Sequence, residues 1–484
     1  MKKSANGLTM SNLPKTKLPL WDKTLRKSLL AQQHYHNPFP VRGKVYKVLG
    51  PMLEATGLKS SIGHVCEISC NASQAIEAEV VGFRGDYTLL MPVGSTTGIA
   101  PGDPIRPLSS LPTIRTGDHL LGRVLDALGN PMDNRPMPVT GRETCIRGTK
   151  LNPFDRHIID KPMQLGVRAM DACLPMGRGQ RLGLFAGAGI GKSSLLGMLA
   201  RNSDAEVNII ALIGERSREV REFLDVALGE EALKNSVVIV ATSDMPPVLR
   251  VRAAYIATTI AEAFRDKGRN VLLMVDSLTR IAQSQREIGL MLGEPPASKG
   301  YTPSCFSIMA ELLERSGPGV STGDISGLYT VLVEGDDLQA DPVADSAMSI
   351  LDGHIILDRK LAEQGHFPAI NLLRSVSRLD NQLLTAQQMQ TVRKFRKKMS
   401  LYERMEDMIS LGAYERGTNP ELDQIISIMP KIRKFLQQEL HSSSSRAETA
   451  QGLLELVSKM SNEESFNETR NVPDINAAQR TGAQ

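Results

Sequence analysis

Arg181–Leu196, with the sequence RLGLFAGAGIGKSSLL, is the stretch that decides the fold of this 484-residue chain. A short apolar run leads into a glycine-rich loop that ends in Gly-Lys-Ser, and apolar residues at helical spacing follow it. A strand, a glycine-rich loop and a helix in this order are typical of a phosphate-binding P-loop. We therefore predict that the chain binds a nucleoside triphosphate at this loop.

Each part of the loop has an expected role. Its glycines let the backbone turn N–H groups toward a phosphate, and the N-terminus of the following helix adds positive charge. Lys192 is expected to reach the β- and γ-phosphates, and Ser193 to bind Mg²⁺. Ala186 stands where the first glycine of the motif is usual, and alanine is the mildest replacement there. The predicted nucleotide-binding run is Gly187, Ala188, Gly189, Ile190, Gly191, Lys192, Ser193 and Ser194.

The composition is ordinary for a globular protein, with 41% hydrophobic and 23% charged residues. The net charge of +4 is small for this length and gives no global argument for nucleic acid. Five scattered cysteines form no zinc-binding spacing, which favours reduced thiols in a cytosolic protein. No apolar run is long enough to span a bilayer, and the N-terminus lacks a secretory apolar region. We expect a soluble cytoplasmic protein.

Residues 1–40 are expected to be a basic, flexible arm that contains a short amphipathic helix. Trp21, Leu25 and Leu29 fall on one side of that helix, and lysine and arginine greatly outnumber acidic residues around it. Such a segment can dock on a partner helix or on an anionic membrane surface. A solvated tail explains the same composition equally well.

Residues 41–112 are predicted to form a small antiparallel β-barrel. Short alternating runs are separated by glycine, proline, asparagine and aspartate. The expected strands are VRGKVYKVLG, HVCEISC, AIEAEVVGF and DYTLLMPV. The segment is poor in aromatic residues and does not interleave them with basic ones, so we do not expect a nucleic-acid stacking platform. Packing between neighbouring subunits is the role that we expect.

Residues 113–380 are predicted to form an α/β domain with a parallel sheet, because apolar strand-like runs alternate with helical stretches. Such sheets bind ligands at the carboxyl ends of their strands. The expected strands are Leu182–Phe185, Val207–Ile213, Val237–Val240, Val271–Val275, Tyr329–Val333 and His354–Leu357.

The remainder of the chain is predicted to be a helical domain, residues 381–460, and a disordered tail, residues 461–484. Apolar residues from Met389 to Met405 keep roughly helical spacing. The other face is crowded with basic residues, which we interpret as the solvated side of a packed helix. These residues are Arg393, Lys394, Arg396, Lys397 and Lys398.

Three further residues are candidates for the chemistry of hydrolysis. Asp276 ends an apolar run, which is the place of a Walker-B carboxylate facing Mg²⁺. Glu215 follows another predicted strand and can polarise an attacking water, although a surface charge cluster that opens a helix fits the same residues. Arg378 is a candidate arginine finger, although a surface arginine is the simpler interpretation from sequence alone.

Taken together, AGAGIGKS, IGERSREV, LLMVDSLTR, EGDD and FPAINLLRSVSR resemble the catalytic subunits of the rotary F-type and V-type ATPase superfamily. Within it the chain is most similar to the type III protein-export ATPases, in particular their flagellar branch. The resemblance extends from about residue 41 to about residue 440. It implies a RecA-like P-loop ATPase core, preceded by the barrel and followed by the helical domain.

The resemblance also implies roles for single residues. Glu215 matches the general base of the family, with Arg216 following it, and Glu219 matches a carboxylate of the Mg²⁺ water shell. Asp276 matches the Walker-B position, which makes Ser193, Glu219 and Asp276 the implied Mg²⁺ set. Further implied roles are an arginine near the phosphates for Arg280, an adenine-stacking ring for Phe367 and a finger inserted from the neighbouring subunit for Arg378. The pair Asp336-Asp337 has no role that we can derive, and a turn explains it.

The implied function is ATP hydrolysis by a homohexameric motor of the flagellar export apparatus, with ATP and Mg²⁺ as cofactors. Implied partners are a regulator dimer docked on the basic segment Trp21–Leu30, a central stalk, chaperone–substrate complexes and an export gate at the inner membrane. The protein would then be cytoplasmic and peripherally bound to that apparatus, and it would not bind nucleic acid. An injectisome export motor, a subunit of a proton-driven synthase and a hexameric RNA translocase are the alternatives.

Overall fold

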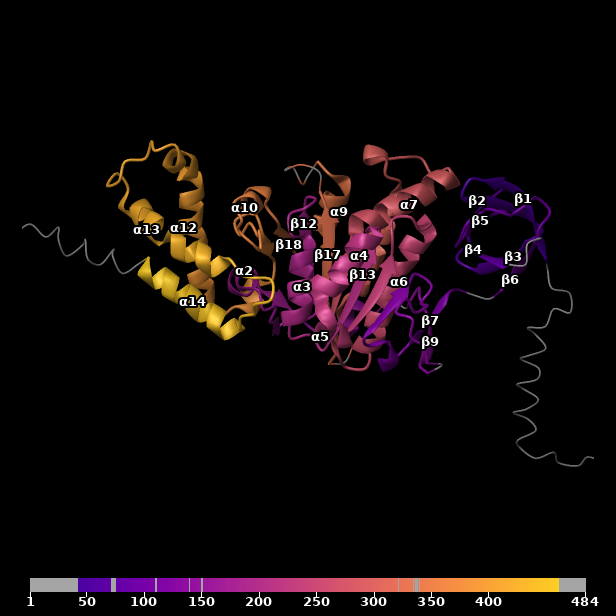
Figure 1. Ribbon diagram of the computed structural model, residues 1–484, viewed down its shortest axis with the longest axis horizontal. Coiled ribbons are helices and arrows are strands. Elements are labelled where there is room, and N and C mark those ends of the chain that lie inside the picture. Colours follow the sequence, from indigo (N-terminus) through magenta and orange to yellow (C-terminus); the bar gives the residue numbers. More distant parts are fainter. Residues whose placement is uncertain are drawn as a thin grey trace, which may run out of the picture.

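The computed structural model describes residues 42–70, 75–108, 111–138, 140–148, 151–320, 322–333, 335, 338 and 340–460. Three parts follow one another along the long axis of the molecule: a barrel, a central α/β part and a group of helices (Figure 1). The N-terminal arm, the C-terminal tail and the Asp336-Asp337 pair lie outside the described residues. Within the described ranges, no helix is long and apolar enough to cross a membrane.

The predicted barrel is confirmed. It closes in the order β1-β2-β5-β4-β3-β6, and all neighbouring strands are antiparallel. Two strands were missing from the expected set: β2 has almost no alternation because both of its faces are buried, and β6 is short and begins and ends with proline. The six strands are β1 (Gly43–Leu49), β2 (Met52–Thr56), β3 (Val65–Ser69), β4 (Ala75–Arg84), β5 (Tyr87–Pro92) and β6 (Pro104–Pro107).

The predicted parallel sheet is also confirmed. Its strands lie in the order β19-β18-β12-β17-β15-β13-β14-β8, and β16 pairs with β17. The pairs from β18 to β8 are parallel, whereas β19 and β16 are antiparallel additions. Every expected run coincides with a strand, although Val333 and Leu357 lie one residue beyond the ends of β17 and β18. The short strands β8, β16 and β19 were not expected. The bounds are β8 (Arg123–Asp126), β12 (Arg181–Ala186), β13 (Val207–Ile213), β14 (Ser236–Ala241), β15 (Asn270–Asp276), β16 (Gly317–Pro318), β17 (Asp324–Leu332), β18 (Gly353–Ile356) and β19 (Val376–Ser377).

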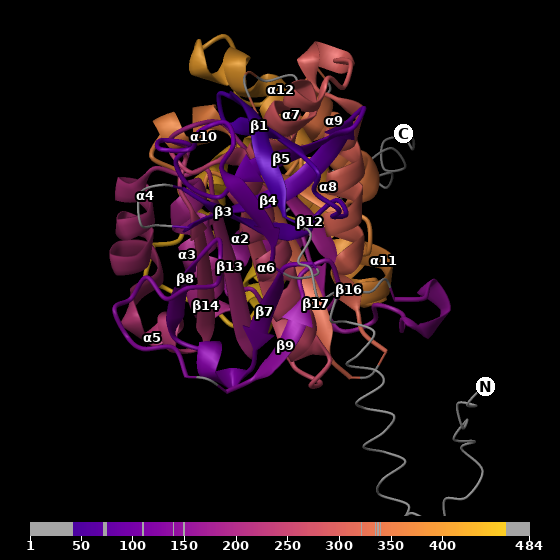
Figure 2. The same cartoon turned by 90° about the vertical axis from the view of Figure 1, so that its right-hand side faces the viewer.

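Helices cover both faces of this sheet (Figure 2). Because side chains alternate along a strand, Ile209, Ala211 and Ile213 of β13 pack in one apolar core with α6, α7 and α8. Ile210 and Leu212 pack in a second core with α2, α3 and the C-terminal helices. The helices of the central part are α2 (Arg168–Cys173), α3 (Lys192–Asn202), α4 (Ser217–Glu222), α5 (Gly229–Lys234), α6 (Pro247–Arg265), α7 (Leu278–Leu292), α8 (Pro303–Arg315), α9 (Pro342–Ile350), α10 (Arg359–Glu363) and α11 (Asp380–Leu383).

Short elements complete the central part. A π-helical turn, η3 (Phe223–Leu228), joins α4 to α5. Two small sheets pair β7 (Thr113–Thr116) with β9 (Arg142–Cys145) and β10 (Pro162–Met163) with β11 (Met176–Gly177). The 3₁₀ turns are η1 (Asp118–Leu120), η2 (Pro153–Asp155) and η4 (Ser298–Gly300).

The C-terminal part is helical, as predicted, and consists of α12 (Ala386–Ser410), α13 (Pro420–Leu436) and α14 (Arg446–Lys459). A capping box on Thr385 begins α12. The expectation that its whole basic row is solvated is wrong at two positions. Lys398 is buried and donates to the carbonyl oxygen of Met460 at 3.1 Å, and Arg396 donates to that of Cys173 at 3.0 Å. These two cations satisfy helix-end carbonyl groups inside the domain contact instead of facing water.

Candidate active site

The predicted catalytic residues gather at the carboxyl edge of the sheet, where β12, β13 and β15 end. β12 ends at Ala186 and the glycine-rich loop follows it. Glu215 comes two residues after β13, and Asp276 is the last residue of β15. Because these strands are parallel, their carboxyl ends meet at one edge. Residues that are far apart in the sequence therefore surround the same loop.

The loop has the backbone geometry that phosphate binding requires. Gly189 and Gly191 have positive φ values of 76° and 87°, which glycine adopts without strain. Lys192 then begins α3, so the first free N–H groups of this helix point toward the loop. Ala186 departs from the usual motif without cost because it is still an extended strand residue that pairs with Leu332. A Cβ atom is therefore acceptable at that position.

Lys192 joins the two candidate carboxylates. Its Nζ atom donates to Asp276 Oδ1 at 2.5 Å and to Glu215 Oε1 at 3.0 Å. All three side chains are largely buried, with 10%, 3% and 16% of their surfaces exposed. Thr330 on β17 donates to the same Asp276 oxygen at 2.6 Å. Of the two interpretations that the sequence left open for Glu215, the geometry includes both, since α4 begins two residues later while the carboxylate faces the loop lysine.

The electrostatics of this cluster reflect burial and close pairing. Burial raises the pKa of the Asp276 carboxyl, and the adjacent Lys192 opposes that shift. Burial alone would lower the pKa of Lys192, but the charges of Asp276 and Glu215 outweigh it and raise that pKa. Lys192 is therefore held in its charged form, which is the form that can bind a phosphate.

Two of the remaining predicted residues flank Glu215. A hydrogen bond with Glu215 is the main cause that lowers the pKa of Glu219, so these carboxyl groups are in contact. Arg280 packs its side-chain stem over Gly214, where an added Cβ atom would lie 2.8 Å from Arg280 Cγ. Its Nη1 atom donates to Gln283 at 3.0 Å, and its buried Nε atom has no hydrogen-bond partner among the described residues. Arg216 lies at the outer side of the cluster, where its Nη1 atom is 3.8 Å from Glu219 Oε1 and 78% of its side chain is exposed.

Phe367 lies beside the loop despite being 176 residues from Gly191 in sequence. A Cβ atom added at Gly191 would lie 3.5 Å from the Phe367 ring, so the ring packs against the loop. The side chain is 46% exposed, and its carbonyl oxygen accepts a hydrogen bond from the backbone N–H of Gln438 at 2.9 Å. The structure thus leaves an aromatic face available next to the phosphate loop.

The same cluster fits the way in which Mg²⁺ binds to nucleotide sites. Mg²⁺ usually takes one or two carboxylates, several waters and substrate phosphates rather than an all-protein cage. Within the part of the chain that the structure describes, no group of three or more His, Cys, Asp or Glu residues could hold a metal ion by itself. Three carboxylates, Asp276, Glu215 and Glu219, lie around the buried Lys192, and Ser193 is exposed at the start of α3. These residues suit a cation that arrives with the nucleotide.

Arg378 is the one predicted catalytic residue that the chain does not bring to the loop. It follows β19, and its backbone N–H donates to the carbonyl oxygen of Asp352 at 3.0 Å, just before β18 begins. This is the amino edge of the sheet, which lies across the length of β12 from the loop. The six residues of β12 span roughly 17 Å at about 3.3 Å per residue. Arg378 is exposed and donates to the carbonyl oxygen of Met348 at 3.0 Å.

The sequence did not predict two residues that lie beside the loop and its carboxylates. Thr330 is a polar residue inside an apolar strand, which was a usable signal. Arg359 places Nη2 within 3.5 Å of a Cβ atom added at Gly187, and it lines a cavity of about 310 Å³ beside the loop. A larger cavity of about 490 Å³ lies between α10 and helices α12 and α13, and none of the predicted catalytic residues lines it. We therefore place the site by its chemistry and not by cavity size.

Three family profiles match successive parts of the chain. Residues 45–109 match the ATP synthase alpha/beta family, beta-barrel domain, and residues 166–377 match its nucleotide-binding domain. Residues 384–455 match the T3SS EscN ATPase C-terminal domain.

Whole-length relatives agree with these profiles. The Flagellum-specific ATP synthase of Bacillus subtilis (strain 168) is 48% identical over 398 residues, which are 82% of this chain and 90% of the relative. The Type 3 secretion system ATPase of Xanthomonas euvesicatoria is 43% identical over 87% of this chain and 94% of the relative. Among solved structures, the assembled ATPase EscN from the enteropathogenic E. coli type III secretion system has a TM-score of 0.81 and 42% identity, covering 86% of this chain and 100% of that chain. EscN in complex with its central stalk EscO has a TM-score of 0.79 and 41% identity.

Proposed function

The chain belongs to the ATP synthase alpha/beta family, in the branch of flagellum-specific ATP synthases and type III secretion ATPases, and from this membership we propose how it works as an ATPase. It hydrolyses ATP as a homohexameric motor of a flagellar type III protein-export apparatus. Each active site lies between two subunits, with the loop and carboxylates from one and Arg378 from the next.

One observation carries this proposal: the chain separates Arg378 from its own phosphate loop. The finger lies exposed at the amino edge, roughly 17 Å from the loop across β12. Subunits that contact one another head to tail bring the amino-edge face of one copy to the loop of the next, and such contacts form a ring when the rotation between copies closes. A ring therefore supplies the positive charge that each single chain lacks over the transferring phosphoryl group.

The residues of one subunit then divide the work. Lys192 exchanges its carboxylate partners for the β- and γ-phosphates, while backbone N–H groups of Gly187–Ser194 surround them. Glu215 orients and polarises the attacking water, with Arg216 next to it. Ser193, Asp276 and the water-binding Glu219 would hold Mg²⁺, which would supply charge neutralisation at the phosphates. Arg280 lies near the phosphates, and the Phe367 ring stacks on adenine.

The partners that we propose follow from family membership. They are a central stalk, a regulator dimer on the N-terminal arm, chaperone–substrate complexes and an export gate at the inner membrane. This places the protein in the cytoplasm, peripherally bound to the export apparatus. An injectisome motor is the second candidate, because a type III secretion ATPase and the EscN structures match nearly as well as the flagellar relatives. Restored motility in a strain that lacks its own flagellar export ATPase supports the flagellar assignment, whereas restored injectisome secretion alone contradicts it.

The finger is tested by Arg378→Ala. Losing one donor that stabilises transition-state charge costs about 2.7–4 kcal/mol, so we expect kcat to fall roughly 10²- to 10³-fold with nucleotide affinity unchanged. The measurement is steady-state ATPase activity together with binding of a fluorescent ATP analogue, at a protein concentration where ring formation is verified by mass. Arg393→Ala, another exposed arginine, serves as the matched control and keeps its rate. Near-normal turnover in Arg378→Ala would remove the finger from the mechanism.

A further inference from the structure

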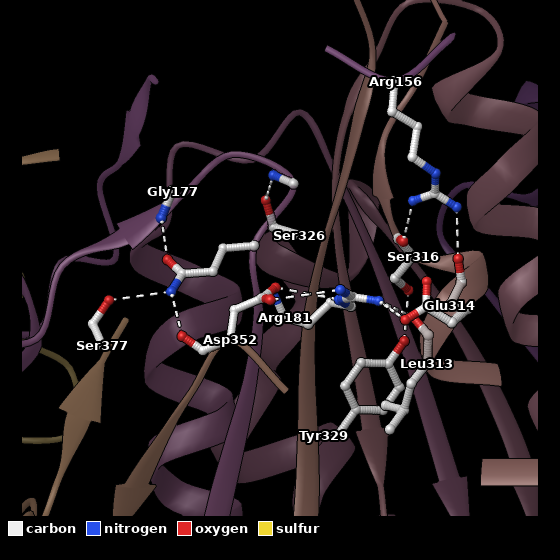
Figure 3. A network of polar contacts seen from close by, with 12 residues as sticks. Arg156, Gly177, Arg181, Leu313, Glu314, Ser316, Ser326, Tyr329, Asp352 and Ser377 are labelled. Atoms are coloured by element: carbon white, nitrogen blue, oxygen red, sulfur yellow. Dashed lines mark hydrogen bonds and ion pairs between the residues drawn. The ribbon is translucent and has the colours of Figure 1, made fainter. Parts of the chain in front are cut away.

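A buried glutamine lies between the phosphate loop strand and the finger. Gln180 is 0% exposed and immediately precedes β12. Its Oε1 atom accepts from the backbone N–H of Gly177 at 2.8 Å, and its Nε2 atom donates to the carbonyl oxygen of Asp352 and to Ser377 Oγ, both at 3.1 Å. Figure 3 shows these three partners converging from separate segments. A buried amide costs free energy unless it is fully hydrogen-bonded, and this one is.

Two of these partners hold the backbone of Arg378. Ser377 directly precedes it, and the carbonyl oxygen of Asp352 that accepts from Gln180 also accepts from the Arg378 N–H, at 3.0 Å. The Asp352 carboxylate is fixed in turn by Arg181, whose backbone N–H and Nε atoms donate to Oδ2 at 3.1 and 3.2 Å (Figure 3). Hydrogen bonds through Ser377 and through the carbonyl oxygen of Asp352 therefore fix the backbone at Arg378.

The strand that precedes the finger is short, and hydrogen bonds on both sides of it fix its position: the backbone N–H of Ile356 donates to Ser375 Oγ at 2.9 Å. β19 has two residues, and it pairs with β18 only through Gly353 opposite Ser377 and His354 opposite Val376. The approach at Gly353 is close, since an added Cβ atom would lie 2.5 Å from the Val376 carbonyl oxygen. A short edge pairing of this kind frays easily, so the side-chain bond from Gln180 to Ser377 adds to its order.

We propose that Gln180 is a positioning residue for Arg378. By bonding Ser377 and Asp352 it sets where the guanidinium group stands on the face that a neighbouring subunit meets. This inference rests on the proposed function, because it presupposes that Arg378 completes the neighbour's site. The competing explanation is that Gln180 supports its own phosphate loop through β12, which it directly precedes.

A double-mutant cycle separates these explanations. Gln180→Leu removes the amide at similar volume, and a misplacement of about 1 Å at a catalytic group costs up to roughly 10²-fold in rate. We expect kcat to fall about 10-fold or more, with KM and the affinity for a fluorescent ATP analogue unchanged. In an Arg378→Ala background the same substitution should have no further effect on kcat, because its target is gone.

Two further variants keep the test decisive. Ser377→Ala removes one of the two acceptors of the Gln180 amide, together with the hydrogen bond between Ser377 and Asp380, and leaves Gln180 itself in place. It is expected to fold and to show a smaller loss of kcat that is also absent in the Arg378→Ala background. Gln424→Leu, another buried glutamine that lies on α13, controls for a general loss of stability and should keep its kcat.

The outcomes distinguish this inference from the proposed function. An unchanged rate in Arg378→Ala overturns the proposed finger and this inference with it. If Arg378→Ala is slow but Gln180→Leu and Ser377→Ala keep the native rate, only this inference fails. It also fails if Gln180→Leu slows both backgrounds equally or weakens nucleotide binding, since either result assigns Gln180 to its own loop.

Discussion

The two edges of the central sheet handle charge in opposite ways. At the carboxyl edge, Lys192 is buried between Asp276 and Glu215, and each charge has a partner within the chain. At the amino edge, Arg378 is exposed, and no carboxylate among the described residues pairs with it; its guanidinium group donates to a backbone carbonyl oxygen. The charges of the first edge are paired within one chain. The second edge presents a cation to solvent, where the proposed ring would place a neighbouring subunit.

This difference separates stability from catalysis. A residue whose partners lie within the chain contributes to folding as well as to chemistry, so its removal changes both. An exposed residue that acts in a neighbouring subunit, as we propose for Arg378, contributes little to the stability of the single chain. The carboxyl edge should therefore be the sensitive region in unfolding experiments, and the amino edge should be sensitive only in turnover.

The largest expected effect on stability is that of Lys192→Ala. Removing one partner of a buried ion pair leaves an uncompensated charge and costs about 3–5 kcal/mol. We expect that loss in urea unfolding followed by circular dichroism, without nucleotide, at pH 8. The loss should shrink as pH falls, because burial already raises the pKa of Asp276 and its protonation removes the unpaired charge. Nucleotide binding should be lost at every pH.

Two variants calibrate this result. Lys192→Ala combined with Asp276→Asn removes both members of the closest pair and should recover much of the stability. Arg378→Ala, from the other edge, should change the free energy of unfolding by less than about 0.5 kcal/mol. Equal destabilisation by Lys192→Ala and Arg378→Ala would break the contrast between the two edges.

Asp171 is a buried carboxylate that has no lysine partner among the residues that the structure describes, and burial is the largest cause of its pKa shift. Asp171 on α2 accepts from the backbone N–H groups of Leu165 and Gly166 at 2.9 and 2.7 Å. Burial raises its pKa to about 6, and these two hydrogen bonds oppose the shift. The folded state therefore binds more protons than the unfolded state between about pH 4 and the folded pKa. Stability is fully present below the unfolded pKa and is lost as pH rises through this window, by on the order of 2–3 kcal/mol.

Asp171→Asn should remove this acidic dependence while lowering stability by a constant amount, because one backbone N–H loses its acceptor. The measurement is the free energy of unfolding at several pH values between about 4 and 7. Asp133→Asn is the control: its hydrogen bond with Arg123 holds the pKa of Asp133 well below its usual range. Asp133 therefore titrates below about pH 4, and its replacement should leave the profile between about pH 4 and 7 unchanged. A native pH profile that survives in Asp171→Asn would show that another group titrates.

Local patterns predicted most of the fold and the loop. Continuous apolar runs identified the buried parallel strands, because such strands are covered on both faces, and alternation identified four strands of the barrel. The P-loop is recognisable because its strand, glycines and helix start are adjacent in sequence. β2 and β6 were missed because their burial comes from closure of the barrel, which no short window of sequence contains.

Long-range polar contacts were not predictable in the same way. Thr330 and Asp276 are 54 residues apart, and Gln180 and Ser377 are 197 residues apart. Neither pair has a local spacing that distinguishes it from a solvated polar residue. Spacing also did not decide between a catalytic role and a surface position for Glu215. The pairing of β13 with β15 brings it to the edge where it reaches Lys192. For Arg378, the predicted role as a finger from the neighbouring subunit came from the resemblance to a family. Its distance from the loop became known only from the structure of the sheet.

The smallest effect that we predict is that of Thr330→Val, which removes a single hydrogen bond at the carboxyl edge. Thr330 is fully buried and donates to Asp276 Oδ1 at 2.6 Å. Thr330→Val keeps the shape and removes this bond, which should cost roughly 1.5 kcal/mol because Lys192 still pairs with the same oxygen. Partners of a metal-binding carboxylate typically change metal affinity by about 10- to 100-fold, so half-maximal ATPase activity should need about 10-fold more Mg²⁺. Thr258→Val, equally buried on α6 but bonded to a helix carbonyl group, is the control. If both variants keep the native Mg²⁺ dependence, Asp276 does not need Thr330 for its orientation, and the carboxyl edge depends on Lys192 alone.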